Sequence, residues 1–250
     1  MKKTINLALI VLLLFGCSSD NKKNGLKGNV KAVKEFQYES VMKFGEIAKE
    51  EKAIHEFNNK YDKRGNRIEL TYYSNGDFSY KLISKYDDKG NQIEDNWYDL
   101  KGNITSKEIY NYDDKGNQIE RNNYQPNGDL IQKITYEYDE KGNKIEDNYD
   151  DDGSISQKTV SKYDKKNHQY QYTVYHSDGS LYFSYKGKYD EEGNLIKEIY
   201  YDSDGVVSSE HTYKNEYEYE YDKEGNWVKS ISFKNEKPEY IKEREIDYYK

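Results

Sequence analysis

The sequence has few of the residues that cross-link or interrupt a fold. Among its 250 residues there is one cysteine, so no disulfide can form within the chain, and there are two prolines, Pro126 and Pro238. Because proline interrupts sheet hydrogen bonding, its scarcity leaves long runs free to pair as strands. The N-terminal apolar run, Ile5–Phe15, is shorter than the ~20 residues that a membrane-spanning helix needs. A net charge of -8 without any basic stripe argues against nucleic acid as a partner.

The first residues have the pattern of an export signal. Lys2 and Lys3 precede the apolar run, and Gly16 with Cys17 forms a small-residue processing site. The stretch Leu14-Phe15-Gly16-Cys17 resembles the lipobox of bacterial lipoproteins, although Phe15 stands where a smaller residue is commoner. The resemblance implies that Cys17 is the lipid attachment site and that several acyl chains anchor the protein to a membrane. The alternative is an ordinary secretory signal with an incidental cysteine.

These features predict three parts of the chain. Residues 1–16 are a lipoprotein signal peptide, residues 17–25 are the lipidated cysteine with a polar tether, and residues 26–250 are one repeat domain. Ser18 stands where an aspartate would resemble inner-membrane retention, so the pattern resembles outer-membrane sorting. We therefore expect a lipid-anchored protein of the bacterial outer membrane, on either its periplasmic or its external side.

The composition combines high polarity with many aromatic rings. A mean hydropathy of -1.23 and 34% charged residues lean toward disorder. However, the chain also has 29 Tyr, 7 Phe and 2 Trp, and disordered chains are poor in aromatics. Tyrosine joins an apolar ring to a polar tip, so it can build a thin, ordered core that is hydrated at its edges.

A repeat organises most of the chain. The nonamer YDDKGNQIE occurs at residues 86–94 and again at 112–120. Two series of turns interleave with a period of 25 or 26 residues. One series follows a YDxxGN frame, and the other contains SNGD, LKGN, PNGD, DDGS, SDGS and SDGV. The first series has its turns at Gly65, Gly90, Gly116, Gly142, Asn167, Gly193 and Gly225, and the second at Gly76, Gly102, Gly128, Gly153, Gly179 and Gly205.

The segments between the turns have the pattern of strands. Asp-Lys-Gly-Asn is typical of a hairpin turn, and Leu130–Tyr138 places its apolar residues on one face with a period of two. A weak helical signal at Glu46–Phe57 is interpreted as a longer hairpin arm, because Gly45 and Gly65 are 20 residues apart, like Gly205 and Gly225. The sequence predicts an all-β, antiparallel array of about eight hairpins, or ~15 strands, in a twisted or spiralling open sheet.

The repeated motif resembles a known family. Tyr-Asp-x-x-Gly-Asn followed by an aliphatic residue is similar to the YD repeat of RHS-repeat proteins, from Tyr61 to about Lys234. Large members are implied to form a β-shell around a toxic C-terminal domain. Eight hairpins are too few for that, so a short bacterial lipoprotein member is the closer match. A weaker resemblance is to MORN-like repeats.

Catalysis and metal binding find little support. Most carboxylates occupy repeated turn positions, whereas a catalytic pair needs one distinctive pocket, so we expect no enzyme and no cofactor. The histidines, His55, His168, His176 and His211, lack metal-ligand spacing. Asn148, Asp150 and Asp152 match the first half of a calcium loop, but Thr159 replaces its final glutamate. A solvated acidic turn is the favoured interpretation of that stretch.

Aromatic clusters are the candidate ligand surfaces. The proposed contact residues are Trp97, Tyr98, Tyr170, Tyr172 and Tyr175, and the unit around Tyr170 also loses its turn glycine and gains His168. For most of these rings a place in the core is the favoured interpretation. We expect a non-catalytic binding or interaction module for a glycan or an envelope protein. The alternatives are a structural spacer or self-assembling surface scaffold and, as a third interpretation, a glycan-active enzyme.

Overall fold

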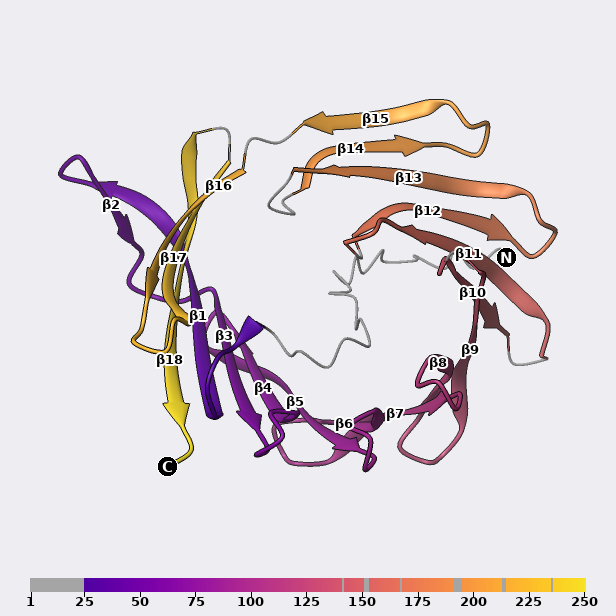
Figure 1. Ribbon diagram of the computed structural model, residues 1–250, viewed down its shortest axis with the longest axis horizontal. Helices are drawn as coiled ribbons and strands as arrows, with labels where there is room; N and C mark the ends of the chain where they lie inside the picture. Colours follow the sequence, from indigo (N-terminus) through magenta and orange to yellow (C-terminus); the bar gives the residue numbers. More distant parts are fainter. Residues whose placement is uncertain are drawn as a thin grey trace, which may run out of the picture.

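A computed structural model describes residues 25–140, 142–150, 153–166, 168–190, 195–212, 215–234 and 236–250. These residues form one sheet of 18 strands and no helix, and the sheet curls round without closing (Figure 1). The predicted all-β, antiparallel and open architecture is confirmed. Within the described ranges there is no helix that is long and apolar enough to cross a membrane.

Two kinds of strand alternate along the chain. Incoming strands end at the tyrosine of a Tyr-Asp turn, and outgoing strands begin just after it. The incoming strands are β3 (His55–Tyr61), β5 (Asp77–Tyr86), β7 (Ile104–Tyr112), β9 (Leu130–Tyr138), β11 (Ile155–Tyr163), β13 (Leu181–Tyr189) and β16 (Asn215–Tyr221). The outgoing strands are β4 (Arg67–Ser74), β6 (Gln92–Tyr98), β8 (Gln118–Tyr124), β10 (Lys144–Tyr149), β12 (Gln169–His176), β14 (Leu195–Tyr201) and β17 (Trp227–Lys234). The others are β1 (Val30–Lys43), β2 (Glu46–Lys49), β15 (Val207–Thr212) and β18 (Lys237–Tyr248).

The turn chemistry explains the YDxxGN frame. In the first such turn, the Gly65 N–H donates to the Asp62 carbonyl at 2.8 Å, and the Asp62 N–H donates to the Asn66 carbonyl at 2.9 Å. Gly65 has φ 76, a conformation that glycine adopts without strain. The Asp62 carboxylate accepts the Asn66 backbone N–H at 2.8 Å and its side-chain amide at 2.9 Å. Aspartate, glycine and asparagine each therefore make a specific contribution to this turn.

The tyrosine of the frame joins neighbouring hairpins. The Tyr86 hydroxyl donates to the Arg67 carbonyl at 2.8 Å, and the Tyr112 hydroxyl donates to the Gln92 carbonyl at 2.7 Å. The same bond recurs from Tyr138 to Gln118 at 3.1 Å and from Tyr189 to Gln169 at 3.0 Å. In each case the acceptor is the backbone carbonyl of the first residue of the preceding outgoing strand. This contact needs equal spacing, so it explains why the repeat length varies so little.

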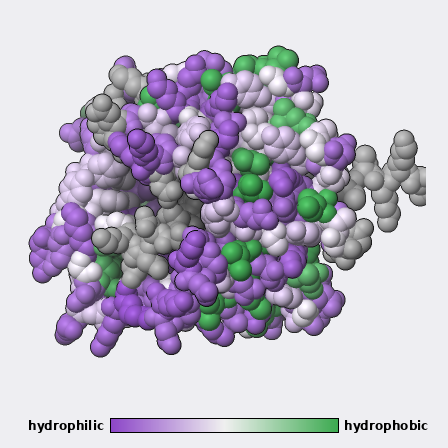
Figure 2. Space-filling model, turned by 45° about the vertical axis from the view of Figure 1, so that its right-hand side comes forward, coloured by the Kyte–Doolittle hydropathy of each residue, from purple (hydrophilic) through white to green (hydrophobic). Residues whose placement is uncertain are grey.

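The sheet has two unlike faces. The tyrosine face holds the buried apolar side chains, among them Leu82, Ile134 and Tyr136. The charged face holds ladders in which a glutamate is flanked by lysines of adjacent strands: Glu94 contacts Lys85 at 2.6 Å and Lys107 at 2.9 Å. Burial acts to raise the pKa of Glu94, but hydrogen bonds from Lys85, Asn96 and Lys107 together lower it to about 2. Figure 2 shows that hydrophilic residues dominate one side of the molecule, with hydrophobic residues only as small separate patches.

The first and last described strands meet in the sheet. β1 pairs with β3 on one side and with β18 on the other, so Val33 lies opposite both Asn59 and Ile246. Val30, Val33 and Tyr61 form a buried cluster against which Ile246 and other partly buried residues pack. A purely sequential array of hairpins, as the repeat predicts, does not include this long-range pairing. It gives the curled sheet a seam between its first and last strands.

The two segments with 20 residues between turn glycines, Gly45 to Gly65 and Gly205 to Gly225, do not form the single longer hairpin arms that the sequence predicts. The first divides into β2 and β3, which both pair with β1. The second divides into β15, which pairs with β14, and β16, which pairs with β17. Among the described residues β15 and β16 do not pair with each other, and Figure 1 shows the sheet open at this point. These divisions, together with β18, raise the number of strands above the ~15 that the turn spacing predicts.

Candidate functional site

Trp97 and Tyr98 lie on opposite faces, because they are neighbours in β6. Trp97 is opposite Leu82 on the tyrosine face, whereas Tyr98 is opposite Lys81 on the charged face. The Trp97 ring packs against Tyr80, with centroids 4.8 Å apart. The structure therefore does not bring this pair together as one surface.

Trp97 ends an aromatic ladder that crosses four strands. Phe57 stacks on Tyr72 at 4.8 Å, Tyr72 contacts Tyr80 at 5.3 Å, and Tyr80 contacts Trp97. The Tyr72 hydroxyl lies 2.7 Å from His55 Nδ1, and burial lowers the pKa of that histidine. Burial likewise raises the pKa of Tyr80. These rings are occupied with one another and hold β3 to β6 together.

Tyr172 belongs to a second ladder on the same face. Its ring stacks on Tyr185 at 5.1 Å, Tyr185 contacts Tyr200 at 5.3 Å, and Tyr200 contacts His211 at 6.3 Å. Burial, followed by the charge of Glu198, raises the pKa of Tyr200 to about 12. Tyr175 points the other way and is opposite Lys158, which pairs with Asp147 at 3.4 Å on the charged face. Tyr172 and Tyr175 therefore do not share a ligand surface.

Beside the first ladder the tyrosine face holds a polar cluster. Asp95, which is 5% exposed, accepts hydrogen bonds from Ser84 Oγ at 2.6 Å and from the Tyr110 hydroxyl at 2.9 Å. The Tyr110 oxygen is also 2.6 Å from Glu108 Oε2, and Glu108 is directly opposite Asp95. A phenol carries one proton, so it serves the two carboxylates in a shared hydrogen bond. Burial and the charges of Asp95 and Glu108 raise the pKa of Tyr110.

The sequence did not point to this polar cluster. Asp95 and Glu108 each look like one more solvated carboxylate in an acidic chain, and their cross-strand pairing appears only once the register is known. Across the parts of the chain that the structure describes, no group of three or more histidine, cysteine, aspartate or glutamate residues is arranged to hold a metal ion.

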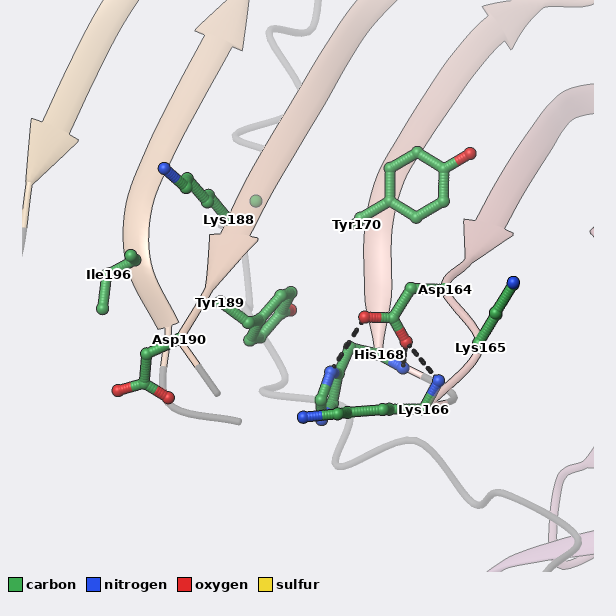
Figure 3. Close-up of a pocket in the computed structure, with 10 residues that line it drawn as sticks. Asp164, Lys165, Lys166, His168, Tyr170, Lys188, Tyr189, Asp190 and Ile196 are labelled. Carbon is green, nitrogen blue, oxygen red and sulfur yellow. Dashed lines mark hydrogen bonds and ion pairs between the residues drawn. The ribbon is translucent and has the colours of Figure 1, made fainter. Parts of the chain in front are cut away.

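Tyr170 has a different environment from the other predicted aromatic residues. It is 39% exposed and lies beside an open hollow of about 840 Å³ that extends across the turn ends of β12 to β14. The residues lining the hollow are Asp164, Lys165, Lys166, His168, Tyr170, Gly187, Lys188, Tyr189, Asp190 and Ile196. Figure 3 shows Tyr170 on one side of Tyr189, with Lys188 and Ile196 on the other. Tyr170 occupies the repeat position that holds Ile68, Ile93 and Ile119 in other units.

His168 completes the turn beside this hollow in place of the usual asparagine. Its backbone N–H donates to Asp164 Oδ1 at 2.8 Å, and its ring Nδ1 lies 3.0 Å from Asp164 Oδ2. These contacts, led by the backbone hydrogen bond, lower the pKa of Asp164. The imidazole stacks on Tyr189 with a centroid distance of 4.9 Å. The departure from the YDxxGN frame was the sequence signal for this site, whereas Lys188 and Tyr189 were not singled out.

The other predicted site residues lie elsewhere. Asn148 Oδ1 accepts a hydrogen bond from Gln132 at 3.3 Å within the sheet, and the Asp150 carbonyl accepts the Gly153 N–H at 2.9 Å in a turn. Asp152, the third of the weak calcium candidates, and Cys17, the predicted lipid attachment site, fall outside the described residues.

Comparison with known proteins places the chain in no family. No family model and no curated protein matches it. Among solved structures, a porin-like protein from Bacteroides uniformis has a TM-score of 0.47 at 9% identity, covering 89% of this chain and 98% of that one. Two structures of TcdB2-TccC3 have TM-scores of 0.34 at 14% and 15% identity, covering 71% and 79% of this chain but 11% and 10% of theirs. At these scores the likenesses assign neither a family nor a function. The chain is a β-repeat protein whose hairpins form one open sheet.

Proposed function

We propose that this chain is a non-catalytic binding module of the bacterial cell envelope, and that its ligand is a glycan held in the hollow beside Tyr170. The observation that carries the proposal is the contrast between aromatic residues. Trp97 and Tyr172 are packed into ladders, whereas Tyr170 leaves part of its ring exposed at the edge of a hollow. An exposed ring next to a concave polar surface suits the apolar face of a sugar.

The side chains around the hollow favour a glycan that carries negative charge. Lys165, Lys166 and Lys188 line it and can bind a carboxylate or sulfate as point charges. Of the two aspartates there, Asp164 is engaged by the His168 turn. Three lysines against two aspartates make the charge of the lining positive, opposite in sign to the whole chain, which has a net charge of -8. Repulsion by the acidic remainder would disfavour binding of the same ligand elsewhere.

The proposed location follows from the N-terminal sequence. A lipid on Cys17 would attach the sheet to the outer membrane through the short tether, as the lipobox-like residues imply. Labelling cells with a fatty-acid analogue tests this step: incorporation is expected in the natural chain and absent in Cys17→Ala. Labelling that persists in Cys17→Ala would contradict the anchor.

A structural role is the second candidate, and the ladders favour it. Most of the conspicuous aromatic side chains contact each other across strands, as expected of a scaffold. The RHS-like repeat, if it marks a short member of that family, is compatible with either role. The hollow distinguishes the two, because a spacer has no need of it.

Binding of soluble protein from Ser18 onward to neutral and anionic oligosaccharides separates these roles. Tyr170→Ala is expected to lose most of the binding to an anionic oligosaccharide without unfolding. Tyr182→Ala is the matched control, since Tyr182 is a 43% exposed tyrosine of the adjacent strand β13 that does not line the hollow. Equal binding by both variants would overturn the site. Absence of binding to any glycan would leave the scaffold as the better account.

A further inference from the structure

β16 is an edge strand with an open side. It pairs with β17, and no strand of the described chain occupies its other side. β15 cannot fill the vacancy as an antiparallel partner. The sheet runs from β15 back to β3, and from there through β1, β18 and β17 to β16, with each strand antiparallel to the next. This path contains an odd number of strands, so β15 and β16 point in the same direction. An edge of this kind exposes backbone N–H and C=O groups that can pair with another chain.

The aromatic side chains of β16 are unusually exposed for their repeat positions. Tyr217, Tyr219 and Tyr221 lie in a row on the tyrosine face, with successive ring centroids 6.0 Å apart. Tyr221 is 61% exposed, whereas Tyr61, at the same position of β3, is 6% exposed. β3 has a strand on both sides, whereas β16 has a described neighbour only on its β17 side.

The missing neighbour also leaves a hydrogen bond unmade. Tyr86 and Tyr112 each donate their hydroxyl to a backbone carbonyl of the outgoing strand one repeat earlier. At Tyr221 that strand would have to lie beside the open edge of β16. Within the described residues, no acceptor is found for the Tyr221 hydroxyl. An added strand would supply a backbone carbonyl to accept the Tyr221 hydroxyl, as the neighbouring strand does for Tyr86 and Tyr112.

The charges of β16 indicate the chemistry of such a strand. Glu218 and Glu220 are exposed on the charged face, and Glu220 already contacts Lys229 of β17 at 2.9 Å. At the position of Glu220, just before the frame tyrosine, four other incoming strands carry lysine (Lys60, Lys85, Lys162 and Lys188), whereas β7 carries Asn111 and β9 carries Glu137. β16 carries glutamate at both Glu218 and Glu220 and contains no lysine, so its open edge presents negative charge to an added strand.

We propose that the open edge of β16 binds, by antiparallel strand addition, an extended segment of another protein in which lysine or arginine alternates with aliphatic or aromatic residues. Its backbone would continue the sheet, its basic side chains would face Glu218, and its apolar side chains would cover Tyr217 and Tyr219. This interaction is separate from the glycan hollow at β12 to β14 and does not depend on it.

Titration of soluble protein with a capped peptide of about eight residues alternating lysine and valine, the length of an ordinary strand, tests the proposal. NMR shifts are expected in β16 and β17, together with saturable binding by calorimetry. Glu218→Lys is expected to weaken binding by about tenfold or more through charge repulsion. Glu137→Lys is the matched control, because Glu137 is an exposed glutamate of β9, which has a strand on both sides.

Two further probes test the backbone pairing. A peptide with the same side chains but alternate N-methylated amides cannot form the strand and is expected not to bind. Equal binding of that peptide, no loss in Glu218→Lys, or no binding to protein that is folded by circular dichroism would each overturn the proposal. Dimerisation through β16, seen by sedimentation and by the same NMR shifts without peptide, would assign the edge to a second copy and would also overturn it.

Discussion

At the scale of single residues, the aspartate of each turn links pH to stability. Asp113 is the clearest case: hydrogen bonds from the Asn117 side chain and backbone hold the pKa of its carboxyl below the usual range. The pKa values of Asp99 and Asp164 are lowered in the same direction by their own turns. A depressed folded-state pKa contributes stability that is present above the unfolded pKa and is lost as pH falls through the folded value.

The free energy of unfolding is therefore expected to decrease as the pH falls below about 4, the ordinary aspartate pKa. Asp113→Asn should be less stable at neutral pH and should lose less stability on acidification than the natural chain. Urea unfolding at neutral and acidic pH measures both effects. Asp114→Asn, one residue along in the same turn, is the control and should keep the natural pH dependence. An unchanged pH slope in Asp113→Asn would contradict this account of the turn.

Gly187 provides a second residue-scale test. A Cβ at this position would lie 2.6 Å from the Tyr185 hydroxyl oxygen and 3.1 Å from Leu195 Cδ1, so the tyrosine ring lies over the glycine. Gly187→Ala is expected to cost about 1–3 kcal/mol in the free energy of unfolding, the usual range for overpacking. Adding Tyr185→Phe removes the clashing oxygen and should restore part of that loss. A neutral Gly187→Ala, measured by urea unfolding, would show that the ring moves freely.

At the scale of strands and hairpins, the repeat could be predicted from the sequence because its recurring turn residues act locally, within their own turn. Glycine at positive φ and the Asp-Asn pair fix the turns, so the turn spacing predicted the alternation of strands. The faces were less predictable. Ile68 and Ile93 lie at bulges and are 37% and 36% exposed, although an alternating pattern places such residues in a core. A bulge shifts the alternation by one residue and has no sequence signature of its own.

The hairpin-to-hairpin hydrogen bond can be tested with two tyrosines at one repeat position. Tyr112→Phe removes the hydroxyl that donates to the Gln92 carbonyl at 2.7 Å, and should cost about 1 kcal/mol in the free energy of unfolding. Tyr221→Phe is the matched variant at the sheet edge, where no acceptor is found within the described residues, and should cost little. Urea unfolding of both variants gives the comparison. Equal losses would argue that the hydroxyl acts through something other than this bond.

At the scale of the whole molecule, two features lay beyond the sequence. The pairing of β1 with β18 joins residues about 200 positions apart, and neither strand has a sequence feature that identifies the other as its partner. The opening between β15 and β16 arises because the two halves of the segment between Gly205 and Gly225 pair with different strands, β15 with β14 and β16 with β17. The candidate site was reachable only in part. The loss of glycine beside His168 marked a unit that borders the hollow, but the hollow is also lined by Lys188 and Tyr189 from the next hairpin.

The seam made by β1 should control the stability of the strands on both of its sides, β3 and β18, at once. Val33 is 3% exposed and lies opposite Ile246 and Asn59, so Val33→Ala should cost about 2 kcal/mol through a cavity at the junction of three strands. Because β1 is the only described strand between β3 and β18, amide hydrogen exchange should accelerate in both of those strands, despite their distance in the sequence.

Ile134→Ala is the matched control for this experiment. Ile134 is 1% exposed in β9, whose partners β8 and β10 are its neighbours along the chain. Its exchange effect should therefore remain in one continuous stretch of sequence. Hydrogen exchange followed by mass spectrometry resolves the two patterns. If Val33→Ala accelerated exchange only near residue 33, the strands at the two ends of the chain would be held by their hairpins, and β1 would be an addition to the sheet rather than its seam.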